Sequence, residues 1–292
     1  MGRMKKSLLL LPFLFLACEE QPQEQEPRTP QEMYERAQAL LKPNVHGQQS
    51  DFEGALQWTR RAAEAGLLQA QTDLGGLYLN GGRGVAPDFA ESYRWFSKAA
   101  EQGSLQAEVF VGMLLYDGQG VAQDRPAALL HWRKAANAGI AEAQFRLGRA
   151  LAQQAETVQE GITLLEQSAR EGQSGGIPQA ATTLGNIYYR GANGAPQNPQ
   201  LAAVWYAKGA SAGDPLAQWV YAEMLLEGNP VPQDEQRGLA MLRMAAGQDF
   251  VPAIGRLINT LRNLPDAAAH EQEAEAWNRR LTELQQKAAK NK

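Results

Sequence analysis

Small and apolar residues recur at a fixed spacing through most of the chain. In one clear stretch they stand at offsets 0, 4, 8 and 11, as Ala70, Leu74, Tyr78 and Gly81. At 100° per residue these offsets fall within roughly 80° of one another, so they form one stripe on an α-helix. A second helical pattern follows a glycine-rich turn, and both patterns return after 36 or 37 residues. The sequence therefore predicts a tandem array of helix pairs, because one pair alone cannot bury its stripe.

The ends of the second helices are marked in the same way in four units. Each of these helices is preceded by a natural N-cap residue, namely Asp88, Asp124, Asn198 and Asp234. In the first of these units Trp95 follows, and Gly103 ends the helix. Gly75, at offset 5 of the first helix, costs about 1 kcal/mol relative to Ala. We therefore expect a neighbouring helix to approach closely at that glycine.

The complete unit reads Ala70-x3-Leu74-Gly75-x2-Tyr78-x2-Gly81-x2-Gly84-Val85-x2-Asp88-x6-Trp95-x3-Ala99-Ala100-x2-Gly103. This pattern closely resembles the Sel1-like repeat family, which is related to the tetratricopeptide repeats. The resemblance covers about residues 31–265 and implies an all-α, right-handed α-solenoid of stacked helix pairs that usually serves as an adaptor for protein complexes. Residues 143–180 depart from the pattern, so the superhelix is expected to bend or loosen there.

The first 18 residues have the pattern of an export signal. Three cations precede an apolar run, residues 8–17, which is too short to cross a bilayer as a mature helix. Residues 14–18 resemble the lipobox of bacterial lipoproteins, although Phe15 stands where that family prefers Leu. The resemblance implies cleavage before Cys18 and acylation of this cysteine. An ordinary secretory signal that happens to end at a cysteine is the alternative.

Acyl chains on Cys18 would hold the protein to a membrane without crossing it, at about 0.8 kcal/mol per buried methylene. In the lipoprotein family an Asp after the cysteine favours inner-membrane retention, and this chain has Glu19. We therefore expect the periplasmic side of the envelope, with the outer membrane preferred to the inner. The domain prediction is a signal peptide, an acylated Gln/Glu/Pro tether, the repeat array and a C-terminal capping helix, at residues 1–17, 18–30, 31–265 and 266–292.

Charge and cysteine content exclude several classes of function. Lys and Arg number 28 against 32 Asp and Glu, a net charge of −4, and loss of the first 17 residues removes three cations and no acid, which leaves −7. A nucleic-acid binder needs a basic surface, so no nucleic-acid partner is expected. The single cysteine excludes an intramolecular disulfide and a multi-cysteine metal site.

Candidate catalytic and metal motifs are weak. Ser174 lies in a G-x-S-x-G stretch, but a helical pattern precedes it, whereas the nucleophile motif needs a strand-to-helix turn. The three histidines, His46, His131 and His270, have no ligand partner at a metal-binding spacing. His131 takes the place of Trp95 in its unit and is expected to be a packed helix residue. No catalytic, cofactor or metal site is predicted.

A partner would use the side of the first helices that the stripe leaves open. Offsets 2, 6 and 9 point roughly away from the stripe, and side chains at these positions are candidate anchors for a protein partner. They are Val109, Met113, Tyr116, Phe145, Arg149, Asn186, Tyr189, Trp219, Glu223 and Leu226, with Thr182 in the same row. The alternative is that these positions contact the adjacent repeat.

The leading hypothesis is a lipid-anchored periplasmic adaptor that binds envelope proteins through the solenoid surface. A second hypothesis is a secreted hydrolase or β-lactam-binding protein, since some Sel1-type proteins have been described so. Those proteins carry disulfides within each repeat, and this chain has none. A third is an envelope protein that binds peptidoglycan or exopolysaccharide through exposed aromatic residues.

Overall fold

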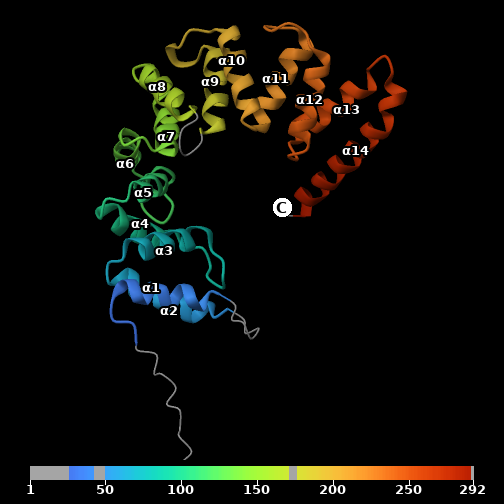
Figure 1. Ribbon diagram of the computed structural model, residues 1–292. Coiled ribbons are helices and arrows are strands. Elements are labelled where there is room, and N and C mark those ends of the chain that lie inside the picture. Colours follow the sequence, from blue (N-terminus) through green and yellow to red (C-terminus); the bar gives the residue numbers. More distant parts are fainter. Residues whose placement is uncertain (1–25, 43–49, 171–175, 291–292) are drawn as a thin grey trace, which may run out of the picture. The chain divides into compact units, whose positions relative to one another are not determined.

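The computed structural model describes residues 26–42, 50–170 and 176–290, and within these residues the regular structure is helical (Figure 1). The prediction of an all-α chain is confirmed. The helices are α1 (Pro30–Leu40), α2 (Phe52–Glu64), α3 (Leu68–Asn80), α4 (Phe89–Glu101), α5 (Leu105–Asp117), α6 (Arg125–Asn137), α7 (Ala141–Leu151), α8 (Val158–Ser168), α9 (Pro178–Arg190), η1 (Ala192–Gly194), α10 (Pro199–Ser211), α11 (Pro215–Glu227), α12 (Glu235–Ala246), α13 (Val251–Arg262) and α14 (Ala267–Lys290).

The chain divides into two compact units, Met1–Leu67 and Leu68–Lys292. Unit 1 contains the antiparallel pair α1 and α2. Unit 2 contains α3 to α14, and each helix in it packs against the next one along the chain. We refer to α3, α5, α7, α9, α11 and α13 as the first helices of unit 2, and to α4, α6, α8, α10 and α12 as its second helices.

The predicted N-caps are confirmed. A side-chain oxygen of Asp88 accepts hydrogen bonds of 3.0 Å from the backbone N–H groups of Ala90 and Glu91. Asp124 and Asn198 each accept one from the residue three positions on, at 2.9 and 3.0 Å. Asp234 does the same. Each cap satisfies donors at a helix start that have no partner within the helix.

The glycine at offset 5 allows a large aromatic side chain to lie against the first helix. A Cβ added to Gly112 would lie 2.5 Å from Trp132 Nε1, and one added to Gly75 would lie 2.7 Å from the Phe96 ring. Gly185 has the same relation to Tyr206. The close approach predicted from the sequence is confirmed, and the approaching group is the second helix of the same repeat.

Repeat loops in unit 2 also reach back to the preceding repeat. Gly120, with φ of +69°, lies so near the start of α4 that an added Cβ would be 2.2 Å from the carbonyl carbon of Phe89. In the repeat of α9 and α10 this contact is different, because Asn193 Nδ2 donates a 2.9 Å hydrogen bond to the carbonyl of Ala152. The loops therefore join consecutive repeats as well as the two helices of each pair.

In the irregular repeat, α7 and α8, the glycine at offset 5 is Gly148, and its nearest neighbours are Gly161 and Leu165 rather than an aromatic ring. An added Cβ on Gly161 would lie 2.6 Å from Ala152 N, and one on Gly148 would lie 2.9 Å from Gly161 O. The two backbones therefore approach directly. Ser168 Oγ donates a 2.8 Å hydrogen bond to the carbonyl of Ala141, and this bond joins the end of α8 to the start of α7.

The C-terminal helix α14 covers the end of the last repeat. Ala274 is its one fully buried residue, while Trp277, Leu281 and Leu284 pack partly buried against the core of α12 and α13. In the described residues, none of the helices has both the length and the apolar character needed to span a bilayer. The predicted signal peptide, Cys18 and residues 19–25 of the tether lie outside the described residues.

Candidate partner-binding surface

The offset 2 residues of the first helices lie at the joints between repeats. Val109 is 2% exposed and shares a core cluster with Trp132 of α6 and with Ala143 and Leu147 of α7. The prediction that Val109 anchors a partner is therefore wrong. Each first helix must pack against its own second helix and against the next repeat, so the stripe of buried positions is wider than offsets 0, 4, 8 and 11 alone.

The same holds along the row. Phe145 packs against the core cluster that α8 and α9 form, and Thr182 is buried. The ring of Trp219 lies 6.0 Å from that of Phe250, at the start of the next repeat. The alternative that these positions contact the adjacent repeat is confirmed for Val109, Phe145 and Trp219.

Offset 9 residues mostly lie over the second helix of their own repeat. The ring of Tyr116 is 5.0 Å from that of Trp132, and the Arg125 guanidinium lies 5.1 Å from the centre of the Tyr116 ring. Leu226 packs against the core cluster of the last repeats. Tyr189 differs, since half of its surface is exposed.

The offset 6 residues remain accessible to solvent. Met113, Asn186 and Glu223 are partly exposed, and Arg149 is exposed. The residues at offsets 3 and 10 flank this row and are also not buried. We define the free face of unit 2 as these three rows: Asp73, Gly76, Asn80, Phe110, Met113, Asp117, Arg146, Arg149, Gln153, Thr183, Asn186, Arg190, Val220, Glu223, Glu227, Arg256, Asn259 and Asn263.

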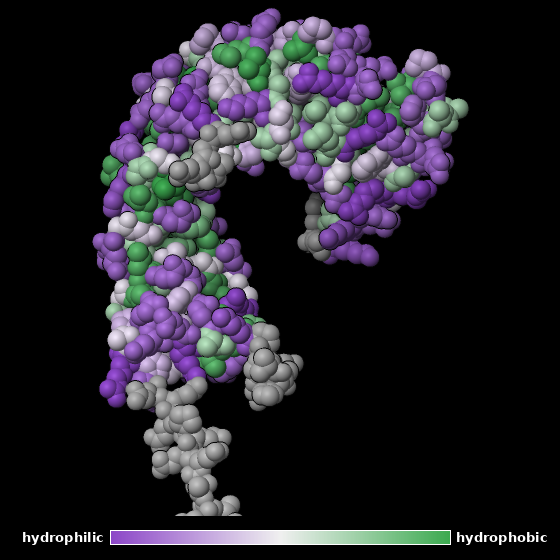
Figure 2. Space-filling view, viewed as in Figure 1, coloured by the Kyte–Doolittle hydropathy of each residue, from purple (hydrophilic) through white to green (hydrophobic). Residues whose placement is uncertain are grey.

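Sequence reasoning found the middle row of the free face and missed the two beside it. Polar and charged residues recur at offsets 3 and 10, as Asp73, Arg146 and Arg190 show, and this recurrence was the available signal. The face of the molecule in Figure 2 is likewise mixed, with hydrophobic residues in small groups among hydrophilic ones. A partner of the free face would therefore meet polar groups more often than a broad apolar patch.

Ion pairs and hydrogen bonds fix several side chains of the free face. Arg256 Nε lies 2.9 Å from Glu223 Oε2, which links the last two first helices. The hydroxyl of Tyr206 donates a 2.8 Å hydrogen bond to Asn186 Oδ1. Burial raises the pKa of Tyr206 to about 12, so the phenol stays a neutral hydrogen-bond donor.

Beside this surface, α5 and α6 hold a buried carboxylate that sequence reasoning missed. Glu108 is 3% exposed, its Oε2 lies 2.5 Å from His131 Nδ1, and Lys134 contacts its other oxygen. The equivalent residues Gln71 and Gln218 are neutral amides that are also buried. In the sequence, the one sign of this pair is that Glu108 stands where other repeats have Gln, and His131 stands in the same repeat where Trp95 stands in its own.

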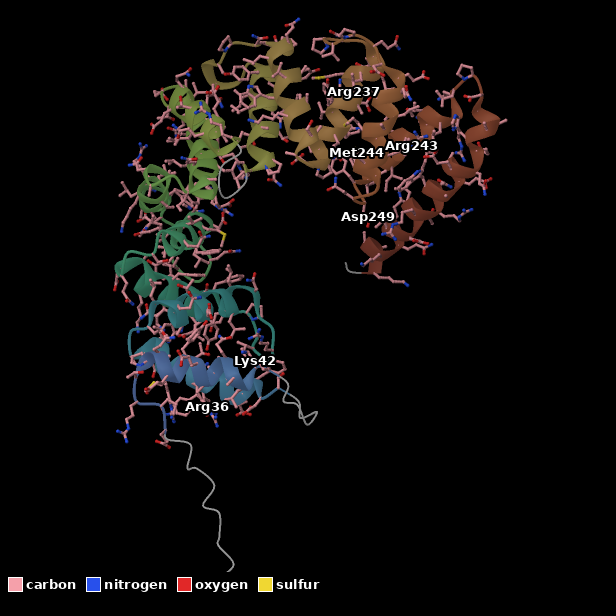
Figure 3. All side chains as sticks on the ribbon, viewed as in Figure 1. Arg36, Lys42, Arg237, Arg243, Met244 and Asp249 are labelled. Carbon is pink, nitrogen blue, oxygen red and sulfur yellow. The ribbon has the colours of Figure 1, made fainter. Side chains whose placement is uncertain are left out.

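Ion pairs also join α14 to the rest of unit 2. Arg243 of α12 binds Glu273 through two hydrogen bonds of 2.8 Å, and Arg280 binds Asp249 through bonds of 2.8 and 2.7 Å. Arg243 and Asp249 lie beside α14 in Figure 3. The hydrogen bond from Arg243 lowers the pKa of Glu273.

Unit 1 has a cleft of its own. It measures about 590 Å³ and lies between the residues that precede α1, the exposed side of α1, and Trp58 of α2. Glu32 at its edge is engaged in the cap of α1, where it accepts hydrogen bonds from the backbone N–H groups of Arg28 and Thr29 at 2.7 and 3.0 Å. These bonds lower the pKa of Glu32, so this carboxylate serves the helix start.

The described residues contain no group of three or more His, Cys, Asp or Glu side chains that could hold a metal ion. His270 lies 3.4 Å from Asp266 at the start of α14, and His131 is engaged with Glu108. Ser174 and His46 lie outside the described residues.

The family model described as Sel1 repeat matches residues 33–67, 68–104, 105–140, 141–173, 178–214 and 215–250. A solved structure, of a protective antigen present in uropathogenic Escherichia coli strains that displays an SLR fold, is 29% identical with a TM-score of 0.72. The match covers 87% of this chain but only 54% of the antigen. The structure of a Sel1 repeat protein from Oxalobacter formigenes is 24% identical with a TM-score of 0.69, over 86% of this chain and 99% of that one.

Proposed function

Because the chain belongs to the Sel1 repeat family, whose members are generally protein-interaction scaffolds, we propose that it is a lipid-anchored periplasmic adaptor. Its partners would be proteins of the cell envelope, bound through the free face. The observation that carries the proposal is that all six first helices of unit 2 leave their side chains at offsets 3, 6 and 10 unburied, while the residues of the stripe are packed in the core.

The character of the free face supports a protein partner. It combines amide groups such as Asn186 and Asn259, charges such as Arg149, and the partly exposed apolar side chains Met113 and Val220. Such a mixture suits a protein surface, in which hydrogen bonds and apolar contacts alternate. Sel1 repeat proteins are typically not enzymes, and the cluster of Glu108 and His131 is a packed structural contact.

The anchor is proposed from the sequence of the export signal. Cys18 is the only cysteine of the chain and directly follows the apolar run of residues 8–17. Two or more acyl chains on Cys18 would make membrane attachment stable. Because Glu19 rather than Asp follows the cysteine, we propose the outer membrane.

The test is crosslinking in cells that carry the C-terminally tagged protein, followed by mass spectrometry of the co-purified proteins. Cys18→Ala is the control for the anchor, and fractionation on a density gradient reports which membrane holds each form. We expect a discrete envelope protein with the wild type and a reduced recovery with Cys18→Ala. Recovery of no specific protein with either form would contradict the adaptor, and an unchanged membrane association of Cys18→Ala would contradict the lipid anchor.

A further inference from the structure

Two arginines on neighbouring first helices stand out by the absence of an acidic partner. The first helices of unit 2 carry five arginines, and three of them pair with a glutamate: Arg146 with Glu142, Arg256 with Glu223, and Arg262 with Glu271. Arg149 of α7 and Arg190 of α9 have no carboxylate partner among the residues that the structure describes. Both are exposed.

The position of Arg149 is fixed by packing. Its guanidinium lies 5.4 Å from the centre of the Phe145 ring, one turn earlier on α7. Phe145 packs against the core cluster of α8 and α9, so the ring beside Arg149 is itself held in place. An aromatic ring accepts no conventional hydrogen bond from the edge of the guanidinium, so this contact leaves N–H groups of Arg149 available to an acceptor.

Asn186 of α9 contributes an oriented donor. Its Oδ1 accepts the hydrogen bond from Tyr206, and this bond assigns the other side-chain atom, Nδ2, as a donor. No acceptor for Nδ2 lies among the described residues. Asn186 therefore presents an N–H donor at the free face, held by a phenol that burial keeps neutral.

Arg190 lies near the same pair. The positive charge of Arg190 partly offsets the effect of burial on the pKa of Tyr206. Arg190 follows Asn186 by four residues, so the two side chains share one side of α9, about one helical turn apart. Arg149 stands on the preceding first helix at the same offset as Asn186.

We propose that Arg149, Asn186 and Arg190 form a docking site for an acidic segment of a partner protein, whose Asp or Glu carboxylates accept from these three groups. The argument for this occupant is charge complementarity. Among the residues that the structure describes, these three groups have no acceptor; α9 carries no acid, and the one acid of α7 is Glu142, which is paired with Arg146. Arginine suits this role because its planar fork can bind a carboxylate through two hydrogen bonds. The half-exposed Tyr189 adds an apolar contact at the edge of the site.

This inference rests on the proposed adaptor function and names the chemistry of the segment that is bound. The probe is a fluorescein-labelled octaglutamate peptide, with octaglutamine as its neutral control, and binding is followed by fluorescence polarisation at 50 and 200 mM NaCl. The matched control variant is Arg279→Gln, which removes an exposed arginine of α14 that does not belong to the three rows of the free face.

Wild type and Arg279→Gln are expected to bind octaglutamate and not octaglutamine, more weakly at the higher salt concentration. The double variant Arg149→Gln/Arg190→Gln should bind at least about tenfold more weakly, and Asn186→Leu several-fold more weakly. Thermal melts by circular dichroism check that each variant folds. The site is overturned if wild type does not bind the peptide, or if the double variant binds as well as Arg279→Gln.

The same double variant separates this inference from the adaptor proposal in cells. If it co-purifies the envelope partner as efficiently as the wild type, the adaptor stands and the acidic docking site is wrong. If the wild type itself recovers no partner, the adaptor fails, and the peptide titration still decides whether the three groups bind carboxylates. Competition of octaglutamate by inorganic phosphate at low millimolar concentration would show an anion site without preference for a peptide, and would also overturn the proposal.

Discussion

Glu108 Oε2 and His131 Nδ1 lie 2.5 Å apart across the helix pair α5 and α6, and the carboxylate is almost completely buried. The ammonium group of Lys134, whose side chain is largely exposed, contacts the other carboxylate oxygen of Glu108. A buried charge is tolerated only when its partners are present, so this repeat depends on electrostatics at a position where three others have a neutral amide.

We predict that His131→Leu lowers the free energy of unfolding by about 1–3 kcal/mol at pH 7, because it leaves Glu108 with Lys134 alone. Adding Glu108→Gln should restore part of the loss, since Gln stands at this position in three other repeats. Urea unfolding followed by circular dichroism measures both effects. Equal stability of wild type and His131→Leu would show that the pair contributes nothing.

A second prediction concerns the close approach at Gly112. Gly112→Ala places a methyl group 2.5 Å from Trp132 Nε1 and 3.1 Å from the carbonyl of Ala128, and should cost about 1–3 kcal/mol even though Ala is the better helix former. Gly76→Ala is the matched control, because no atom lies within 4 Å of its added Cβ. That variant should be stabilised by up to about 1 kcal/mol. Thermal melts compare the two, and a stabilised Gly112→Ala would contradict the packing described for this repeat.

A third prediction tests whether Trp219 serves packing between repeats or partner binding. Trp219→Ala should lower the free energy of unfolding by about 2–3 kcal/mol, because the side chain packs against Phe250 and the last core cluster. Tyr189→Ala, at a half-exposed aromatic residue, should change it by less than about 1 kcal/mol. If the partner is identified, its affinity should fall more with Tyr189→Ala than with Trp219→Ala. A larger loss of affinity with Trp219→Ala than with Tyr189→Ala would mean that Trp219 belongs to the binding surface.

The attachment of α14 should depend on pH. The hydrogen bond from Arg243 lowers the pKa of Glu273 in the folded state, so its stabilisation is present above the ordinary pKa of Glu and is lost as the pH falls through the lowered value. Asp249 has a lowered pKa for the same reason, through Arg280, and its contribution is lost in the same direction. Protection of α14 amides from hydrogen exchange should therefore weaken between pH 5 and pH 3, after correction for the intrinsic exchange rate.

The control for that experiment is a pair of α14 variants at pH 7. Glu273→Gln should raise amide exchange in α14 about two- to fivefold, the effect expected of a partly exposed ion pair, and should reduce the dependence on pH. Glu275→Gln, at an exposed position of the same helix, should leave exchange unchanged. An identical response of both variants would mean that Arg243 and Glu273 do not hold the helix.

Much of this architecture follows from local chemistry, which is why the sequence predicts it. Asp88 caps α4 through bonds to residues two and three positions away, and Gly75 signals a close neighbour because a helix tolerates glycine only for a reason. Val109 was misplaced because the offset rule describes one helix, whereas its burial is decided by Ala143 in the next repeat.

The rest of the surface depends on contacts that no local pattern encodes. Glu108 and His131 are 23 residues apart, and Asn186 and Tyr206 are 20 apart. Either residue of each pair, taken alone, reads as an ordinary polar or aromatic position on an amphipathic helix. The tertiary contacts with His131 and Tyr206 are what make Glu108 a paired buried carboxylate and Asn186 an oriented donor.

The loops that contact the preceding repeat limit which deletions and duplications of single repeats the protein can tolerate. Gly120 fits against the backbone of Phe89 because it has no side chain, whereas Asn193 joins its predecessor through a hydrogen bond to Ala152. In both cases one side of the contact belongs to one repeat and the other side to the repeat before it. Recombination that deletes or duplicates a single repeat would bring together sides that do not match, so the order of the repeats is inherited as a set.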